Sequence, residues 1–588
     1  MEVGFPPTEQ QAMTGHGSER QILRDYLAFA IAIYDEYPGW WTFIAGRFYE
    51  EFVPVRNAYY AAGYVPQGLS NYLPLRFGSD LWSAWLVKSA TGTLPYNASD
   101  MKRVMRTAYA NVTNGYNRVF EEGDDGGSSG GETLNQLAFC GMMAGYLFDD
   151  DTAMSWADFG HYSYVDAVSY LILQSGDAVG DKNHRYDDMD LIVYNGAWLG
   201  QMITHSNWDL NGSATVKMKI GGRMTANHDH ADAGSFQLYY KGLLAGDSGC
   251  YDEYDSTHHI QYHQATVAHN SIVLQNGSTV YGQKQPGEVG SLSAWENSSY
   301  KTGTVNGVSY GYADAEQTIP LYAYLAGDVA DAYVAGAGVT RFDRRMLAVY
   351  DTDNAEAPLY FFVFDDIVSN NASYKKIFLL HTKNEPEIVG KTVTTTHEDG
   401  KLVLQNVFGG DNITKVGGTG HNYDVGGIQK TTAGGENDGY WGRVEISPAT
   451  GNNENVLLNV MYVCHKDDSP SLSAQSISTA EVKGAVIGNT AAIFVTSATR
   501  RSTEFSFTAP GDGYLHYYVS GVAAGNWKVI VGGKTVNFDA ATSDGGFLTF
   551  TALAGETVTL RPGTPGIAVD PSLPVGGWDS FAFGNLVP

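Results

Sequence analysis

The chain has 588 residues, a net charge of −28 at pH 7 and a pI near 4.8, with 43% hydrophobic and 13% aromatic residues. This length exceeds what one hydrophobic core usually organises, so two to four folded units are expected. The acidic balance argues against binding to nucleic acid or to a membrane surface, and no apolar run is long enough for membrane insertion.

Residues from about 18 to 205 show apolar positions at helical spacing. The pattern begins in "SERQILRDYLAFAIAIYDEYPGWWTFIAGRFYEEF" (18–52), which a Pro-Gly pair divides, and returns in "SDLWSAWLVKSATG" (79–92) and "TLNQLAFCGMMAGYLF" (133–148). It appears again in "YVDAVSYLILQSG" (164–176) and "MDLIVYNGAWLGQMI" (189–203). We therefore expect roughly eight to ten helices joined by short loops, arranged as antiparallel hairpins.

From about Ser213 the apolar period changes from 3.6 to 2, as in "SFQLYYKGLLAGD" (235–247) and "LYFFVFDDIV" (359–368). These strand-like runs continue to about residue 470 and predict a large antiparallel sandwich. A further set of short strands follows "SPSLSAQS" (469–476) and predicts a smaller β domain. The predicted organisation is α+β and multidomain, with a helical domain over 1–210, a central β-sandwich over 211–470 and a C-terminal β domain over 471–588.

The stretch "NHDHADAGSFQLYYKGLLAGDSG" (227–249) gathers candidate metal ligands. In an extended segment His228 and His230 point to the same side, and Asp229 points to the other. Asp247 follows the next turn, and His269 opens another strand-like run. Two histidines and a carboxylate that converge suit zinc. The alternative is that these histidines cap turns and bind backbone carbonyls.

The same stretch, followed by "ATVAHNSIVL" (265–274), resembles the heparinase II/III-like polysaccharide lyases. Further similarity lies in "AGDVADAYVAGAGVTRFDRRMLAV" (326–349) and "FLLHTKNEPEI" (378–388), and the resemblance covers about 25 to 390. It implies an N-terminal incomplete α/α toroid followed by antiparallel β-sandwich domains. It also implies a structural zinc ion held by His230, Asp247 and His269, with His228 at the catalytic cleft.

The reaction that the resemblance implies is β-elimination at a uronic acid, which leaves a 4,5-unsaturated uronate. A base must remove the C5 proton, an acid must reach O4, and the uronate carboxylate must be neutralised. The family uses a tyrosine that a histidine or asparagine assists.

The helical region departs from that pattern. In "GYVPQGLSNY" (63–72) Gln67 matches the family's Glu/Gln position, but the expected His or Asn is absent, which leaves Tyr64 or Asn71. The segment "FEEGDDGGSSGGETLNQ" (120–136) lacks the expected tyrosine. The substitutes are Tyr186, assisted by His184, and Tyr262, with Tyr186 preferred.

Other polar residues have both a functional and an ordinary interpretation. Cations that can bind uronate or sulfate groups are Arg56, Arg76, Arg185 and Arg223, each of which can equally form a surface ion pair. The acidic run "EEGDDGG" (121–127) is interpreted as a solvated loop, and "DDMD" (187–190) as the N-terminal cap of a helix. Tryptophans at helical spacing are interpreted as core residues.

We therefore expect a polysaccharide lyase that acts on an anionic polysaccharide, with a glycosaminoglycan such as heparin, heparan sulfate, hyaluronan or chondroitin sulfate as the first choice of substrate. The alternatives are an alginate lyase, a glycoside hydrolase with a carboxylate pair such as Asp125 and Asp187, and a glycan-binding protein without activity. Such polymers occur in the periplasm or outside the cell, so we expect that location, although "MEVGFPPTEQQ" at the N-terminus shows no signal peptide. The three widely spaced cysteines predict neither a disulfide framework nor a thiolate metal cluster.

Overall fold

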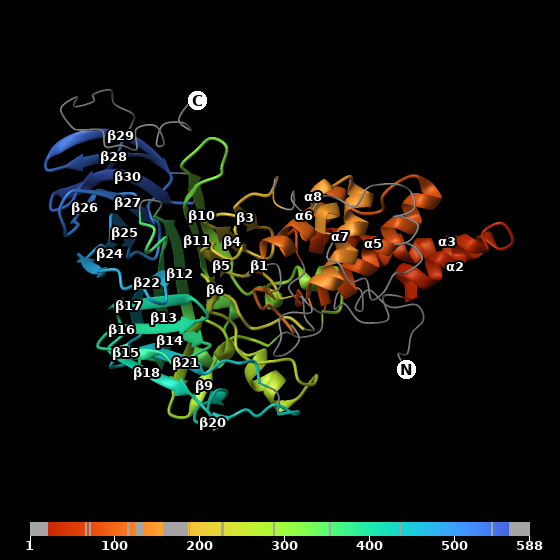
Figure 1. Ribbon diagram of the computed structural model, residues 1–588, viewed down its shortest axis with the longest axis horizontal. Coiled ribbons are helices and arrows are strands. Elements are labelled where there is room, and N and C mark those ends of the chain that lie inside the picture. The colour runs from red at the N-terminus through yellow and green to blue at the C-terminus, as the bar shows by residue number, and fades with distance from the viewer. Residues whose placement is uncertain are drawn as a thin grey trace.

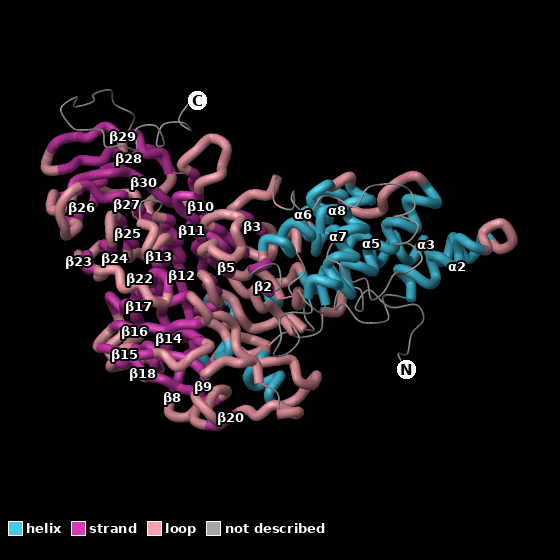
Figure 2. The backbone as a smooth tube through the Cα atoms, viewed as in Figure 1, coloured by secondary structure: helices cyan, strands magenta, loops and turns pink. Residues whose placement is uncertain are grey.

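The computed structural model describes residues 21–64, 67–69, 72–113, 118–124, 133–156, 186, 188–224, 228–285, 289–351, 354–435, 437–542 and 545–563. Helices and strands are segregated along the long axis of the molecule (Figures 1 and 2). The N-terminal helices lie at one end, and the strands that follow in the chain fill the other. The architecture is α+β and multidomain, as predicted. Along the described segments, no helix combines the length and the apolar character needed to cross a bilayer.

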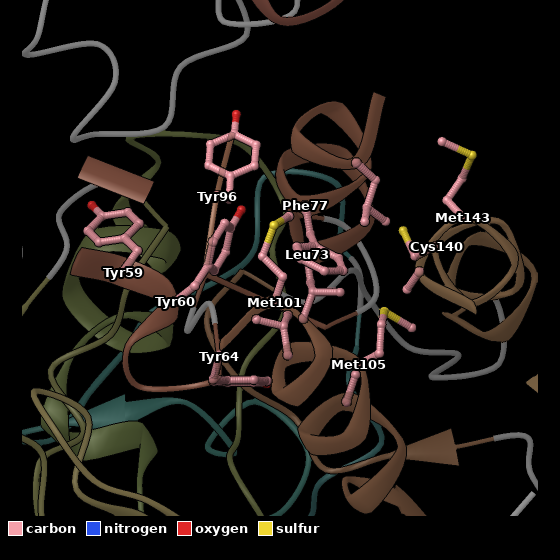
Figure 3. Packing of buried hydrophobic residues seen from close by; sticks show 14 of the residues in the cluster. Tyr59, Tyr60, Tyr64, Leu73, Phe77, Tyr96, Met101, Met105, Cys140 and Met143 are labelled. Atoms are coloured by element: carbon pink, nitrogen blue, oxygen red, sulfur yellow. The ribbon is translucent and has the colours of Figure 1, made fainter. Parts of the chain in front are cut away.

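The helical part is built from short elements that pack around one core. Its helices are α2 (Leu27–Ala32), α3 (Pro38–Arg47), α4 (Val53–Tyr60), α5 (Tyr72–Thr91), α6 (Ala98–Ala110), α7 (Thr133–Phe148) and α8 (Asp151–Ser155). It also contains π-helical turns at Gln21–Tyr26 and Phe48–Phe52. Two short strands, β1 (Val112–Thr113) and β2 (Arg118–Val119), pair with each other. Figure 3 shows side chains of this core, where Leu73 and Phe77 of α5 lie near Met101 and Met105 of α6. These apolar residues are spaced four apart, which places each pair on one face of its helix.

The helix predicted over 189–203 is wrong, because this segment forms two strands. β3 (Ile192–Asn195) and β4 (Gln201–His205) pair as a hairpin in a five-stranded sheet that continues through β5 (Thr215–Lys219), β6 (Phe236–Tyr239) and β7 (Leu243–Ala245). The connection contains Ala197 at φ 48° and Gly200 at φ 59°, left-handed backbone that ends a helix and makes a tight turn. The large sheets of the β part thus begin near residue 192, before the predicted start near residue 213.

The central part contains an eight-stranded antiparallel sheet whose order is β10-β11-β12-β13-β22-β17-β16-β15. In β13, Phe361 and Val363 pack on one face, and Phe362 and Phe364 pack on the other against the C-terminal sheet. Both faces are buried, which is why "LYFFVFDDIV" is apolar throughout instead of alternating. The strands are β10 (Thr304–Tyr312), β11 (Pro320–Asp328), β12 (Val339–Tyr350), β13 (Leu359–Ser369), β15 (Glu387–Val389), β16 (Thr392–His397), β17 (Gly400–Phe408) and β22 (Glu454–His465).

A second five-stranded sheet packs on the same face of the eight-stranded sheet as β3–β7 do. Its order is β18 (Asn412–Gly417), β21 (Gly442–Ser447), β14 (Lys375–Thr382), β8 (Ile272–Asn276) and β9 (Thr279–Tyr281). Smaller elements nearby are β19 (Asp424–Val425), β20 (Ile428–Gln429), α10 (Leu292–Trp295), a π-helical turn at His259–His263 and 3-10 turns at Thr266–Ala268, Ser298–Tyr300, Ala330–Ala332 and Ala335–Ala337.

The C-terminal part is a separate two-sheet sandwich with its own core. One sheet contains β23 (Gln475–Ser478), β24 (Val482–Ile487), β25 (Thr490–Val495), β27 (Tyr514–Ser520) and β30 (Phe547–Leu553). The other contains β26 (Phe505–Thr508), β31 (Thr557–Pro562), β28 (Gly525–Val531) and β29 (Lys534–Thr542). The ring of Phe494 stacks on that of Phe364, with centroids 4.9 Å apart, and so joins this module to the eight-stranded sheet.

Candidate active site and metal centre

The acidic segment 121–124 enters the protein interior, so its interpretation as a solvated loop is wrong. The backbone N–H of Asp124 donates to the carbonyl oxygens of Gln67 and His228, at 3.2 and 3.1 Å. Gly123 has φ 57°, and a Cβ placed there would lie 2.4 Å from the carbonyl carbon of Gln67. Only glycine fits this close approach. The segment therefore connects the helical part to the histidine-rich turn of the β part.

Glu122 anchors this segment through a buried ion network. Its carboxylate lies 2.6 Å from Nζ of Lys217 and 3.3 Å from Nζ of Lys219, two residues on the same face of β5. Lys219 also contacts Asp232 at 2.8 Å. Burial alone would raise the pKa of Glu122, but the two ammonium groups outweigh burial and hold the pKa at about 2. The carboxylate is therefore ionised throughout the physiological range.

Asp124 is fully buried and stands at the centre of a group of imidazoles. Its Oδ2 accepts a hydrogen bond from Nδ1 of His228 at 2.5 Å, and its Oδ1 lies 3.0 Å from Nε2 of His230. Nε2 of His259 lies 3.0 Å from both oxygens, and Nδ1 of His263 lies 3.8 Å from Oδ1. Burial alone would raise the pKa of Asp124, but the hydrogen bonds from the imidazoles lower it well below the usual value.

His228 adopts left-handed backbone with φ 62°, a conformation that is uncommon for residues other than glycine and that occurs often at functional sites. This kink changes the direction of the chain between the two histidines of "HDH", and both reach Asp124. Because a carboxylate only accepts hydrogen bonds, Nδ1 of His228 carries the proton and Nε2 is left without one. Burial, the largest influence, lowers the pKa of His228, so the ring is neutral at pH 7.

Three tyrosines surround His228. The ring of Tyr72, the first residue of α5, stacks on the imidazole with centroids 3.7 Å apart and an interplanar angle of 17°. Tyr251 and the half-exposed Tyr254 contact the imidazole at 5.8 and 5.4 Å between centroids. Arg76 lies one helical turn after Tyr72, and its guanidinium carbon is 5.6 Å from the Tyr72 ring centre. The Tyr72 ring thus contacts both the Arg76 guanidinium and the His228 imidazole. The rings of Tyr251 and Tyr254 form a partly exposed aromatic surface beside them.

His259 and His263 are functional candidates that the sequence analysis missed. They lie four residues apart on one π-helical turn, so both face the same side. The turn is tied to the "HDH" segment, since the N–H of Ala231 donates to the carbonyl oxygen of Gln264 at 2.9 Å. The spacing in "HHIQYH" (258–263) was the available signal. Ligand atoms of Asp124, His230 and His263 lie within 4.8 Å of one another, and all three residues are buried, so they can hold a metal ion.

Comparison with known families identifies the chain. The model described as heparinase II/III-like, C-terminal, matches residues 206–443, and the heparinase II C-terminal domain matches 476–562. These two ranges span more than half of the chain. The chain belongs to the heparinase II/III-like family. A search of curated proteins returned no match.

Solved structures of heparinases are similar to this chain at low sequence identity. The heparinase III-BT4657 gene product is 13% identical, with a TM-score of 0.49, over 80% of this chain and 63% of that one. A heparan sulfate lyase HepC mutant from Pedobacter heparinus is 14% identical, with a TM-score of 0.50, over 81% of this chain and 66% of that one. This chain thus spans slightly less than two thirds of these structures.

The heparinase resemblance implied a zinc ion at His230, Asp247 and His269, and the donor set is chemically suitable. Nδ1 of His269 lies 3.2 Å from Oδ1 of Asp247, and the imidazole rings of His230 and His269 have centroids 5.2 Å apart. Nε2 of His269 makes no hydrogen bond within the described part of the chain. A buried polar atom without a hydrogen-bond partner fits a metal ligand. His230 belongs to both possible ligand sets.

The two tyrosines predicted as catalytic lie elsewhere than at His228. Tyr186 stacks on Trp208 with centroids 4.2 Å apart and meets Trp156 edge-on, within the helical core. No contact found among the described residues joins it to His228. Tyr262 is fully buried beside Tyr423 and donates to the carbonyl oxygen of Asn422, and burial raises its pKa to about 12. Its neighbours explain it as a packing residue near the candidate metal ligands.

The predicted substrate-binding residues divide similarly. Arg76 lies at the His228 site, and Gln67 reaches it through the backbone contact with Asp124. Tyr64 is buried and hydrogen-bonds Glu122. Arg223 donates to the carbonyl oxygens of residues 295 and 297, at 2.7 and 2.8 Å, and so anchors that segment. The positions that lie outside the described residues are Asn71, Asp125, His184, Arg185 and Asp187.

Proposed function

We propose that this protein is a polysaccharide lyase that cleaves a uronic-acid-containing chain by β-elimination and releases 4,5-unsaturated uronate. The first choice of substrate is a glycosaminoglycan: heparin, heparan sulfate, hyaluronan or chondroitin sulfate. The observation that carries the proposal is the Asp124–His228 hydrogen bond beneath Tyr72 and Arg76. This arrangement supplies a base, a proton donor and a cation within one small region.

His228 is the proposed base that removes the C5 proton. Asp124 fixes the proton on Nδ1, and this leaves the lone pair of Nε2 available. The lowered pKa of His228 keeps the imidazole unprotonated at neutral pH. The same Asp124 stabilises the imidazolium that forms when Nε2 takes the proton. This hydrogen bond therefore both orients the base and stabilises its protonated form.

Tyr72 and Tyr251 are the proposed proton donors to the leaving O4. A hydrogen bond links their hydroxyl groups, and burial, the first cause for each, raises both pKa values. Both phenols therefore stay protonated at neutral pH and can donate. This assignment replaces Tyr186 with tyrosines that contact His228.

Arg76 is the proposed partner of the uronate carboxylate. Burial and the nearby Arg56 lower its pKa to about 10, so it remains cationic at neutral pH. Neutralising the carboxylate makes the C5 proton more acidic, because the enolate-like charge that develops in the transition state is stabilised. A guanidinium can hold a carboxylate through two parallel hydrogen bonds.

A divalent metal ion, zinc by its donor chemistry, is proposed at His230, whichever partners complete the set. When bound, such an ion would stabilise the turn that presents His228. A polymeric substrate is met in the periplasm or outside the cell, which is the proposed location.

The test is a panel of heparin, heparan sulfate, hyaluronan, chondroitin and dermatan sulfates and alginate, followed by the near-ultraviolet absorbance of unsaturated uronate. We expect product from at least one polymer, and a loss of about 10²-fold to 10⁴-fold in kcat for His228→Gln. New reducing ends without this absorbance would identify a glycoside hydrolase instead. Binding without any product would identify an inactive glycan-binding protein.

A further inference from the structure

The two oxygens of Asp124 face different partners. Oδ2 accepts the 2.5 Å hydrogen bond from Nδ1 of His228. Oδ1 lies 3.0 Å from Nε2 of His230 and 3.8 Å from Nδ1 of His263. Nε2 of His259 lies 3.0 Å from both oxygens, so Oδ2 contacts the proposed base and His259, whereas Oδ1 faces His230, His259 and His263.

His263 supplies a second, independent observation. The residue is only 6% exposed, and its Nδ1 makes no hydrogen bond to any residue that the structure describes. A buried polar atom without a partner costs about 1–3 kcal/mol, so native proteins usually give it one. Oδ1 of Asp124, at 3.8 Å from this nitrogen, is too far for a hydrogen bond, but the separation suits two ligands of a shared ion.

We propose that Asp124, His230 and His263 hold a divalent transition-metal ion, in place of the ligand set His230, Asp247 and His269 that the resemblance implies. Two ligand atoms that each lie about 2.0–2.1 Å from a tetrahedral zinc ion are about 3.3 Å apart. The observed separations of 3.0 and 3.8 Å from Oδ1 bracket that value. Two imidazoles and one carboxylate suit zinc and its first-row neighbours.

The position of Nε2 of His230 favours this set. An imidazole offers one nitrogen to an ion, and Nε2 faces Asp124. Asp247 and His269 lie 3.2 Å apart, and Asp247 also accepts a hydrogen bond from Gln237 at 3.0 Å. Among the described residues, however, only Asp124, His230 and His263 place three ligand atoms within 4.8 Å of one another. The proposed set has three protein ligands, which leaves one coordination position open, as in catalytic zinc sites.

The proposed ion would join two parts of the protein. Asp124 comes from the segment after the helical ladder, whereas His230 and His263 belong to the β part. Oδ2 of Asp124 remains available to His228 in this arrangement. Loss of the ion is therefore expected to loosen the 121–124 segment as well as the "HDH" turn.

The experiment compares zinc affinity of the full-length protein, measured by chelator competition without polysaccharide, in two pairs of variants. His263→Gln and Asp124→Asn are expected to weaken binding by more than about 100-fold. His269→Gln and Asp247→Asn are expected to stay within about threefold of the wild type. His258→Gln is the matched control, because His258 is equally buried on the same segment and belongs to neither set.

The opposite pattern, equal losses in all four variants, or a wild-type protein that binds no zinc would each overturn the proposal. The two pairs are independent tests, so misfolding of one variant leaves the other pair to decide. Retained affinity in folded His269→Gln alone excludes the implied set. The zinc measurement uses no substrate, so its result holds even if the protein is not a lyase. Conversely, the lyase proposal rests on the Asp124–His228 hydrogen bond and stands even if the protein binds no zinc.

Discussion

Glu122→Gln is the substitution whose effect on stability follows most directly from the structure. The carboxylate of Glu122 is almost fully buried and contacts the ammonium groups of Lys217 and Lys219, also buried. An amide of the same shape leaves Lys219 in contact with Asp232 and removes the one anionic contact that the described residues give to Lys217. Removing one partner of a buried ion pair costs about 3–5 kcal/mol, because the other charge stays buried without compensation.

The pKa of Glu122 gives a second estimate of the same quantity. A pKa near 2 in the folded state, against a usual value of 4.5, differs by about 2.5 units, which corresponds to about 3 kcal/mol at 1.36 kcal/mol per unit. The folded-state pKa is depressed, so this stabilisation is fully present above pH 4.5 and is lost as the pH falls toward 2. The two estimates agree.

The assay is urea unfolding of the wild type and Glu122→Gln between pH 7 and pH 3, followed by tryptophan fluorescence. A multidomain chain is expected to unfold in more than one step, so the transition that the substitution shifts is the one to analyse. The difference in unfolding free energy should be about 3 kcal/mol at pH 7 and should shrink as the pH falls below 4.5. A difference below about 1 kcal/mol, or one independent of pH, would refute the assignment of Glu122 as a buried anion.

Three further substitutions test how the site is assembled. Asp124→Asn should lower kcat by about 10²-fold to 10⁴-fold, because the amide can donate to Nδ1 of His228 and so shift the imidazole proton to Nε2, the proposed base. A wild-type kcat in this variant would contradict the proposed role of Asp124. Tyr72→Phe should lower kcat by at least about 10-fold while Tyr186→Phe does not, and equal losses would show that the contact with the base is irrelevant. Gly123→Ala should destabilise the fold by more than about 2 kcal/mol. The control is Gly92→Ala, which should cost about 1 kcal/mol, because Gly92 has a similar φ but open space around it. Equal melting temperatures of the two variants would argue against the close approach of Gly123 to residue 67.

The β part of the fold was largely predictable from the sequence, whereas one hairpin was not. Alternating or continuous apolar runs predicted most strands after residue 213. The apolar residues of 189–203 match helical spacing and therefore predict a helix, although the segment forms two strands. Gly196 and Gly200 carried the contrary signal, since a glycine pair between two short apolar runs also marks a hairpin. The left-handed backbone at Gly200 shows which signal should have prevailed.

The site was predictable where its residues are close in sequence and unpredictable where the fold brings them together. His228 and His230 stand out as a pair, and their motif also supports the family resemblance. Asp124 lies more than 100 residues before them, in an acidic glycine-rich run whose composition is typical of a solvated loop. Burial of that run depends on Lys217 and Lys219, which appear in the sequence as two ordinary charges on a strand. Only the tertiary contact shows that they neutralise Glu122.

The division of the site between the two parts of the protein has a mechanistic consequence. Asp124 and Tyr72 come from the helical part, and His228 comes from the β part. His228 has left-handed backbone, and the two histidines of "HDH" reach different oxygens of one carboxylate. The proposed base is therefore oriented only when the 121–124 segment is seated against the turn. Activity should then depend on the docking of the two parts as strongly as on the imidazole itself.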